Sequence, residues 1–328
     1  MLPRVSGTFL ADDDPELQRL IGLARDGRIG GAVFFAGDPL SVRHTAQRLQ
    51  QAAPRRLLFG LDAEWGAAMR LEGATRWPRA LAVGATGDPD FAYEMGRTTA
   101  RESLALGIEL VLAPVADLML RADNQVIGNR AFGGDPSAVG EMVAAFVRGV
   151  ESAGAIAVVK HFPGHGATAD DSHATLPVLD VDSLLLEQRE LVPFRAAIDA
   201  GVSAVMPGHL AIPEIDPSGA PASLSPILLG EWLRSRLGFT GLVVSDALDM
   251  QGAREFSWDG RVAARALAAG VDLMLLPTHP EAAHAEILRA VSRGELAAER
   301  VVDAHHRLAR LLADKREWKQ HGESGLWL

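Results

Sequence analysis

Short apolar runs alternate with longer amphipathic stretches along the whole chain, and this alternation limits the possible folds most strongly. Eight runs are expected to be strands, at residues 4–10, 31–35, 57–61, 108–113, 156–159, 203–206, 242–245 and 272–276. Runs this short and this apolar are typical of parallel strands that are covered on both faces. Eight such units with no break in composition predict a single (β/α)8 barrel, and a doubly wound open sheet is the alternative.

The segments between these runs have the pattern of helices. Helices are expected at residues 92–106, 136–152, 184–200 and 227–237, among others. Six glycines stand between a helix and the next strand, where C-terminal helix caps belong: Gly27, Gly107, Gly154, Gly201, Gly241 and Gly270. A last helix, at residues 295–318, is expected to pack outside the barrel with Lys315 and Lys319 as ordinary surface charges. The prediction is one catalytic domain over residues 1–328.

Composition and charge exclude several classes of protein. The net charge of −10 argues against a nucleic-acid groove, which needs a basic surface. No apolar run reaches about 18 residues, so no membrane-spanning helix is predicted. The first residues lack the long apolar region of a secretory leader, and the absence of cysteine excludes a disulfide framework and thiolate chemistry. The cytoplasm is the expected location.

Ionisable residues follow the ends of the predicted strands. Asp62 follows the third run, Lys160 and His161 follow the fifth, His209 follows the sixth and Asp246 follows the seventh. Barrel enzymes place their active sites at the C-terminal ends of the strands. The opposite ends carry little besides glycine and arginine, and this asymmetry indicates an enzyme.

The segment VVKHFPGHGATADDSHATLP, which begins at Val158, is unusually rich in ionisable side chains. It contains Lys160, although lysine supplies only three of the 32 basic residues. Asp171 and His173 are two residues apart, so in an extended segment they share a face. The carboxylate could then fix the tautomer of the imidazole and stabilise its charged form, as a general acid/base requires. The alternative is a loop pair that only stabilises a turn.

Asp246 and three other charged residues are candidates for contact with a ligand. Asp246 follows a buried run, so its carboxylate stands on a rigid scaffold, as a covalent nucleophile should. Asp246 could instead cap the following helix, and this alternative fits Asp249 better. Asp62, Arg70 and Arg130 would suit a hydroxylated ligand, although such residues often form structural salt bridges.

Two functions of other classes also fit the histidines and the barrel. His161, His165, His173 and His209 could bind a divalent metal in a barrel hydrolase. Such hydrolases usually have a pair of histidines on the first strand, and this chain has none there, so no metal is expected. A non-catalytic sugar-binding barrel is a further alternative, but a binder has no need of a nucleophile beside an acid/base pair.

Five segments together resemble glycoside hydrolase family 3, and within it the NagZ-type β-N-acetylglucosaminidases. The segments are LDAEWGAAMRL, APVADL, VIGNRAFGGDP, VKHFPGHGATADDSHATLP and VVSDALDMQGA, in the family's order from Asp62 to Ala253. The resemblance implies that Asp246 is the nucleophile, His173 the acid/base and Asp171 its partner. It also implies that the sugar is bound by Asp62, Arg70, Arg130, Lys160 and His161. We expect His209, which follows the sixth run, to bind the substrate as well.

The implied function is a retaining β-N-acetylglucosaminidase that needs no metal or organic cofactor. Its partner would be a small carbohydrate, either a muropeptide that contains N-acetylglucosamine or a chitooligosaccharide, and a monomer is expected. A β-glucosidase-like or phosphorolytic family 3 enzyme is the alternative. Two departures from the family pattern are Ala247, where a second acid is frequent, and Trp65, where glycine is frequent. Trp65 is expected near the mouth of the site.

Overall fold

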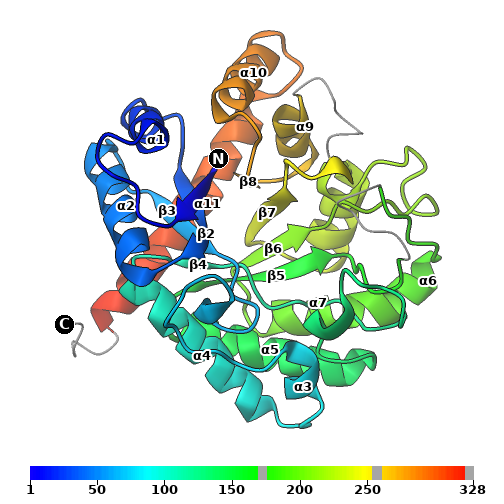
Figure 1. Cartoon of the computed structure of the whole chain (residues 1–328). Helices are drawn as coiled ribbons and strands as arrows, with labels where there is room; N and C mark the ends of the chain where they lie inside the picture. The colour runs from blue at the N-terminus through cyan, green and yellow to red at the C-terminus, as the bar shows by residue number, and fades with distance from the viewer. Residues whose placement is uncertain (169–175, 253–260, 322–328) are drawn as a thin grey trace.

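Eight parallel strands form a closed barrel (Figure 1). The computed structural model describes residues 1–168, 176–252 and 261–321. The strands are β1 (Arg4–Gly7), β2 (Gly31–Gly37), β3 (Leu58–Leu61), β4 (Leu110–Val111), β5 (Ile156–Phe162), β6 (Ala204–Pro207), β7 (Leu242–Ala247) and β8 (Leu273–Leu275). The ring closes at Leu2, whose N–H donates to the carbonyl of Met274 and whose carbonyl accepts from the N–H of Leu276, both at 2.9 Å. The predicted (β/α)8 barrel is confirmed.

Helices surround the barrel and connect its strands. They are α1 (Pro15–Arg25), α2 (Pro39–Ala52), α3 (Ala80–Gly84), α4 (Pro89–Ala105), α5 (Pro136–Ser152), α6 (Ser183–Leu185), α7 (Leu191–Asp199), α9 (Val262–Ala269), α10 (Pro280–Ser292) and α11 (Ala298–His321), with π-helical segments η3 (Leu186–Glu190) and η5 (Ile227–Arg236). Short 3-10 turns are η1 (Ala67–Met69), η2 (Gly128–Arg130) and η4 (Ala222–Leu224). Four helices begin with an Asp-Pro pair, because the aspartate accepts from free backbone N–H groups and proline suits the first turn.

The helix caps show where local prediction succeeds and where it fails. Gly27, Gly107, Gly154, Gly201 and Gly270 all adopt the positive φ that was expected of C-terminal caps. The expectation for Gly241 is wrong, because the positive φ between η5 and β7 belongs to Gly238, at 68°. Gly241 is needed for a close approach instead, since a Cβ there would lie 2.5 Å from the carbonyl oxygen of Ser203.

The inside of the barrel is filled with apolar side chains. Val33, Leu58, Leu110, Val158 and Val244 belong to this interior cluster, and a second, larger cluster lies between the strands and the surrounding helices. A barrel packed in this way has no channel, so a ligand can bind only at one of its ends. Within the described residues, no helix is long and apolar enough to span a membrane.

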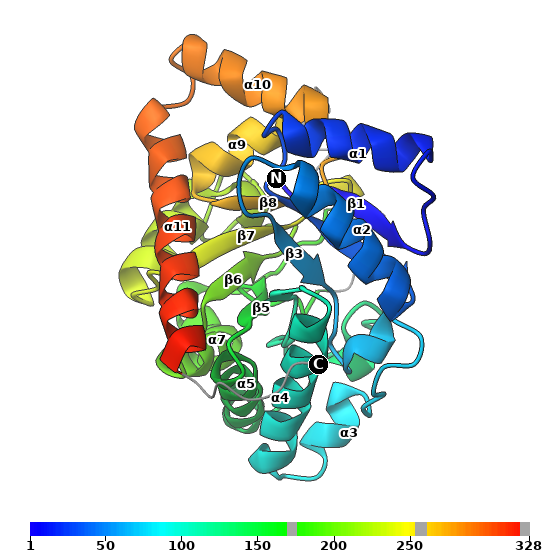
Figure 2. The ribbon, with the colours of Figure 1, turned by 90° about the vertical axis from the view of Figure 1, so that its left-hand side faces the viewer.

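The last helix, α11, covers the N-terminal end of the barrel (Figure 2). Its leucines Leu308, Leu311 and Leu312 pack against the interior cluster. The side chain of Lys315 pairs with Glu151, and its Nζ donates to the carbonyl of Ala155 at 2.7 Å. Lys315 is therefore not an ordinary surface charge, and that expectation is wrong.

A buried acid also holds α11 at this end of the barrel. Asp272 precedes β8 with its side chain fully buried, and it binds Arg300 and Arg307 of α11 as well as Arg234. The expectation that this end carries little besides glycine and arginine is therefore also wrong. The acid and its three arginines fasten the last helix, and the opposite end of the barrel stays open.

Candidate active site

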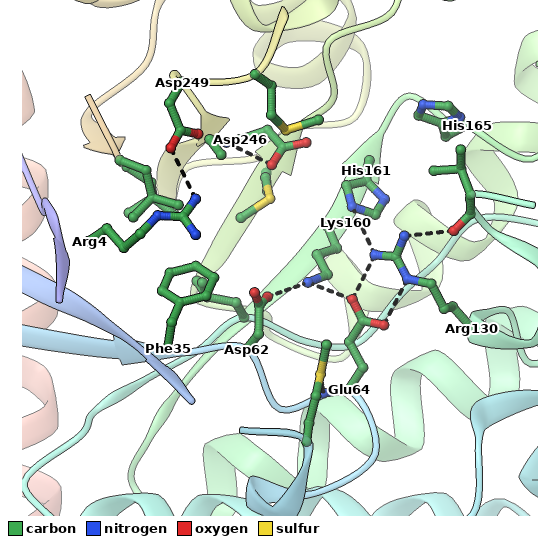
Figure 3. Close-up of a pocket in the computed structure, with 18 of the residues that line it drawn as sticks. Arg4, Phe35, Asp62, Glu64, Arg130, Lys160, His161, His165, Asp246 and Asp249 are labelled. Carbon is green, nitrogen blue, oxygen red and sulfur yellow. Dashed lines mark hydrogen bonds and ion pairs between the residues drawn. The ribbon is translucent and has the colours of Figure 1, made fainter. Parts of the chain in front are cut away.

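A cavity of about 700 Å3 opens at the C-terminal ends of the strands. Its charged and imidazole side chains are Arg4, Asp62, Glu64, Arg70, Arg130, Lys160, His161, His165, Asp246 and Asp249. They come from β1, from β5 and β7 and the residues after each of these two strands, and from the loops after β3 and β4 (Figure 3). The structure therefore brings most of the predicted site residues together at the predicted end of the barrel.

Lys160 stands at the centre of a buried ionic network. Its Nζ lies 2.9 Å from Asp62 Oδ1 and 2.8 Å from Glu64 Oε1, and only 4% of its side chain is exposed. Arg70 binds the other oxygen of Asp62 at 2.8 Å. Arg130 makes two hydrogen bonds to Glu64, at 2.7 and 2.9 Å (Figure 3). Two acids and three bases thus share one wall of the cavity.

The members of this network remain charged at neutral pH. Burial by itself would raise the pKa of Asp62 and of Glu64, but Lys160 and the neighbouring arginines hold both pKa values below the ordinary range. Burial would lower the pKa of Lys160, and the two carboxylates raise it instead. The wall therefore presents both ionised acceptors and ionised donors, which suits a ligand with several hydroxyl groups.

A bulge in β5 turns two successive side chains toward the cavity. Neighbouring residues of a regular strand point to opposite faces, yet Lys160 and His161 both line the cavity. The pairing of β5 with β6 shifts register between Lys160 and Phe162, and the peptide bond between Lys160 and His161 is cis. Bulges of this kind commonly re-aim side chains beside functional sites.

Asp117 fixes the orientation of His161 from behind. Asp117 Oδ2 lies 2.7 Å from Nδ1 of His161 and accepts the backbone N–H of the same residue at 3.2 Å. Nδ1 therefore carries the proton, and Nε2 is directed toward Nη2 of Arg130 at 3.4 Å. Burial would raise the pKa of Asp117, but His161, His165 and the backbone donors lower it. Asp117 was missed as a site residue, although its place after the fourth strand was a usable signal.

Asp246 lies at the end of β7 with its side chain in the cavity. Its Oδ1 accepts the backbone N–H of Ala247 at 2.7 Å. Burial would raise its pKa, but His209, His161, this backbone donor and Lys160 hold the pKa below its ordinary value. The carboxylate is therefore ionised and held on a rigid strand, which are the properties that a nucleophile needs.

The comparisons with known proteins decide the family of this barrel. Residues 24–311 match the model of the glycosyl hydrolase family 3 N-terminal domain. The chain belongs to this family. The predicted family is therefore confirmed, and with it the prediction of a glycoside hydrolase.

Several known proteins are similar over most of this chain. A β-hexosaminidase of Thiobacillus denitrificans is 39% identical over 292 residues, which cover 85% of this chain and 78% of the relative. A β-hexosaminidase of Chromobacterium violaceum is 38% identical over 267 residues, 78% of this chain and 74% of the relative. A solved family 3 β-N-acetylglucosaminidase from Paenibacillus sp. has a TM-score of 0.88 and 35% identity, and the match covers 100% of this chain but 62% of that one.

His209 lies behind the nucleophile candidate of this family 3 barrel, away from the cavity lining. Its ring is fully buried, with Nδ1 2.7 Å from Ser223 Oγ and Nε2 2.9 Å from the carbonyl oxygen of Ala247. Burial lowers its pKa, so the ring is neutral at neutral pH. Both ring nitrogens are thus occupied by protein groups. The structure places His209 among protein groups and not among the residues that line the cavity, as its predicted contact with the substrate would require.

A second wall of the cavity was not anticipated from the sequence. Arg4 forms an ion pair with Asp249 at 3.0 Å, and the guanidinium carbons of Arg4 and Arg70 lie 4.2 and 4.7 Å from the ring centroid of Phe35. The sequence predicts Arg4 only as part of the first strand. Its role could not be predicted because its partner is 245 residues away.

Three other expectations concern Trp65, the acid/base dyad and a possible metal site. The guanidinium carbon of Arg79 lies 3.3 Å from the ring centroid of Trp65, and Trp65 is not one of the residues that line the cavity, so its expected place near the mouth stays a prediction. Asp171 and His173 lie outside the described residues, and their role as acid/base dyad stays a prediction. Across the described ranges, no group of three or more histidine and acidic side chains is arranged to hold a metal ion.

Proposed function

We propose that this family 3 protein is a retaining exo-β-N-acetylhexosaminidase that forms a covalent glycosyl-enzyme on Asp246. The observation that carries the proposal is an ionised carboxylate at the end of β7 in the same cavity as the Lys160 network. The relatives named β-hexosaminidase, at up to 39% identity, support the choice of an N-acetylhexosamine as the sugar.

The network around Lys160 is proposed to bind the terminal sugar. Each sugar hydroxyl can donate one hydrogen bond and accept others, so it is best held between an ionised acceptor and an ionised donor. Asp62 and Glu64 supply acceptors, while Lys160, Arg130 and His161 surround them. Arg70 binds the far oxygen of Asp62 and supports this arrangement.

The proposed reaction has two displacement steps. A carboxylate oxygen of Asp246 attacks the anomeric carbon, the glycosidic bond breaks, and His173 gives a proton to the departing oxygen. His173 then removes a proton from a water molecule, which attacks the same carbon and releases the sugar and the free carboxylate. The assignment of His173, with Asp171 as its partner, rests on the resemblance of the DSH segment to the family.

We further propose that the natural substrates are muropeptides or chitooligosaccharides with a terminal N-acetylglucosamine. This finer assignment rests on the resemblance to NagZ-type enzymes. We also propose that residues 1–328 act as one catalytic domain, with α11 as part of it, and that the protein works as a monomer. The contacts of α11 with Asp272 and Glu151 support its inclusion in the domain.

The decisive experiment combines a substrate panel with one substitution. The native enzyme should hydrolyse the nitrophenyl β-glycoside of N-acetylglucosamine in preference to that of glucose, and phosphate should not accelerate it. Asp246→Asn should lose at least about a thousandfold in turnover, since no anion remains to attack. Asp249→Asn, which changes the other acid of the same segment, should lose far less. Near-native turnover by a folded Asp246→Asn enzyme would exclude Asp246 as the nucleophile.

A further inference from the structure

His165 is a cavity residue for which the proposed reaction gives no role. Its side chain lines the cavity, and the whole residue is only 2% exposed. Its ring lies beside that of His161, with the two centroids 6.2 Å apart, on the side of His161 away from Asp62 (Figure 3). The sequence suggested His165 only as one of four possible metal ligands. Its surroundings point to a different use.

The hydroxyl of Thr168 determines which nitrogen of His165 carries the proton. Thr168 Oγ1 lies 2.7 Å from His165 Nδ1 and 2.9 Å from the carbonyl oxygen of the same residue. A hydroxyl has one proton, and a carbonyl can only accept. If the hydroxyl donated to Nδ1, two oxygens would face each other at 2.9 Å with no proton between them. The hydroxyl therefore donates to the carbonyl, Nδ1–H donates to Oγ1, and Nε2 carries a free lone pair.

The backbone around His165 is fixed by two buried side chains. Asn124 Nδ2 donates to the carbonyls of His165, Gly166 and Thr168, at 3.0, 3.2 and 3.1 Å. Asp117 Oδ1 accepts the backbone N–H of His165 at 2.6 Å. The imidazole is thus held in one place by the same acid that orients His161.

The lone pair on Nε2 of His165 is buried and lacks a hydrogen-bond partner in the part of the chain that the structure describes. Buried polar atoms are nearly always paired in native proteins, and an acceptor left alone costs free energy. Burial lowers the pKa of His165, while the charged or titratable neighbours Asp117, His161 and Asp246 act in both directions. The ring is therefore neutral at neutral pH and can accept a hydrogen bond from a ligand.

We propose that Nε2 of His165 accepts a hydrogen bond from the bound sugar, from a hydroxyl or the acetamido N–H, and thereby positions it against Asp246. The inference rests on the proposed function, because it takes the ligand to be an N-acetylhexosamine. We take the hydrogen-bond donor to be the sugar and not the attacking water for one reason. Asp117 holds both His165 and His161, the two residues lie on one side of the cavity, and His161 is proposed to contact the sugar. His165 is thus a specificity-determining acceptor, since it rejects a ligand that has no donor at this point.

Two substitutions of His165 separate its two nitrogens. The amide of glutamine reaches the place of Nε2, whereas the shorter amide of asparagine reaches only the place of Nδ1. His165→Asn should lower kcat/KM about tenfold, the effect of one lost hydrogen bond to a buried acceptor, and His165→Gln should stay within about threefold of native. Unfolding midpoints confirm that both variants fold. The proposal would be overturned if the two variants had equal kcat/KM, whether both were close to native or both were lowered.

The half-reactions distinguish a sugar contact from a water contact. A contact with the sugar persists in the glycosyl-enzyme, so His165→Asn should slow both the burst of phenol release and the later steady state. If only the steady state slowed, Nε2 would bind the attacking water and the proposal would be wrong. The affinity for N-acetylglucosamine itself, measured by calorimetry, should fall about tenfold in His165→Asn and little in His165→Gln.

The tautomer can be observed directly by nitrogen NMR of the histidine rings. The signals of His165 are those that disappear in His165→Gln, and in the native enzyme they should report a protonated Nδ1 and a bare Nε2. Thr168→Val removes the hydroxyl at nearly constant volume and should shift the tautomer toward Nε2–H, with a loss of kcat/KM. A native ring protonated at Nε2 would refute the inference. A native enzyme that neither binds nor cleaves N-acetylglucosaminides would instead refute the proposed function, whatever the tautomer.

Discussion

Removal of the Lys160 charge should lower the free energy of unfolding, because the carboxylates of Asp62 and Glu64 would lose the cation that they share. Its Nζ lies 2.9 Å from Asp62 Oδ1 and 2.8 Å from Glu64 Oε1, and only 4% of the lysine side chain is exposed. Methionine is close to lysine in length but has no charge and donates no hydrogen bond. Lys160→Met would therefore leave two buried anions that are balanced only by Arg70 and Arg130.

The size of the effect follows from these contacts. Removal of one partner from a buried ion pair costs about 3–5 kcal/mol, because an uncompensated charge is left behind. Each carboxylate keeps one arginine, so we expect the lower end, about 3 kcal/mol of unfolding free energy at pH 7. A domain of ordinary stability, about 5–15 kcal/mol, would still fold.

The loss should depend on pH with a definite sign. In the native enzyme the pKa values of Asp62 and Glu64 lie below their ordinary values, so both acids stabilise the fold above about pH 4.5 and lose this contribution as pH falls. Without Lys160 the two pKa values rise, and protonation relieves the unbalanced charge. The difference in stability between native and Lys160→Met should therefore be largest at pH 7 and smaller near pH 4.

Urea unfolding, followed by tryptophan fluorescence and circular dichroism at both pH values, measures this difference. Arg97→Met is the matched control, because it removes a cation from an exposed pair with Glu94 on α4 and should change stability little. Native stability of Lys160→Met at pH 7 would refute the reasoning. An equal loss at both pH values would also refute it, since the cause would then be packing rather than charge.

The other predictions concern the acid/base dyad and the far end of the barrel. His173→Ala should lose much more rate on a natural disaccharide than on an aryl glycoside with an acidic phenol, and Asp171→Ala should show the same pattern more mildly; equal losses on both substrates would exclude His173 as the acid. Asp272→Asn should destabilise the protein by about 3 kcal/mol in urea unfolding, because three arginines then lose their shared anion. An unchanged midpoint would mean that the ion pairs of Asp272 contribute nothing to holding α11.

The barrel and the face that carries its site could be predicted because both depend on local patterns. A buried parallel strand is a short apolar run, and Asp14 or Asp135 begins a helix through bonds to residues two or three positions away. The C-terminal ends of parallel strands share one end of the barrel, so the sequence already predicts that the residues after them lie close together. The motifs around Lys160 and Asp246 indicated the family for the same reason, since each lies within one segment.

Only the tertiary structure decided which partners these side chains find. The acid that orients His161 is Asp117, 44 residues earlier, and Lys160 meets Asp62 across 98 residues. The sequence grouped His165 and His209 with other histidines, but the fold buried Nε2 of His165 without a hydrogen-bond partner among the described residues and bound both ring nitrogens of His209 to protein groups. Curvature of the barrel brings together residues that are distant in the chain, and periodicity along one strand carries no information about its neighbours. The pattern of the sequence therefore determined the fold and the place of the site, and the packing of the barrel determined which atoms remain available to a ligand.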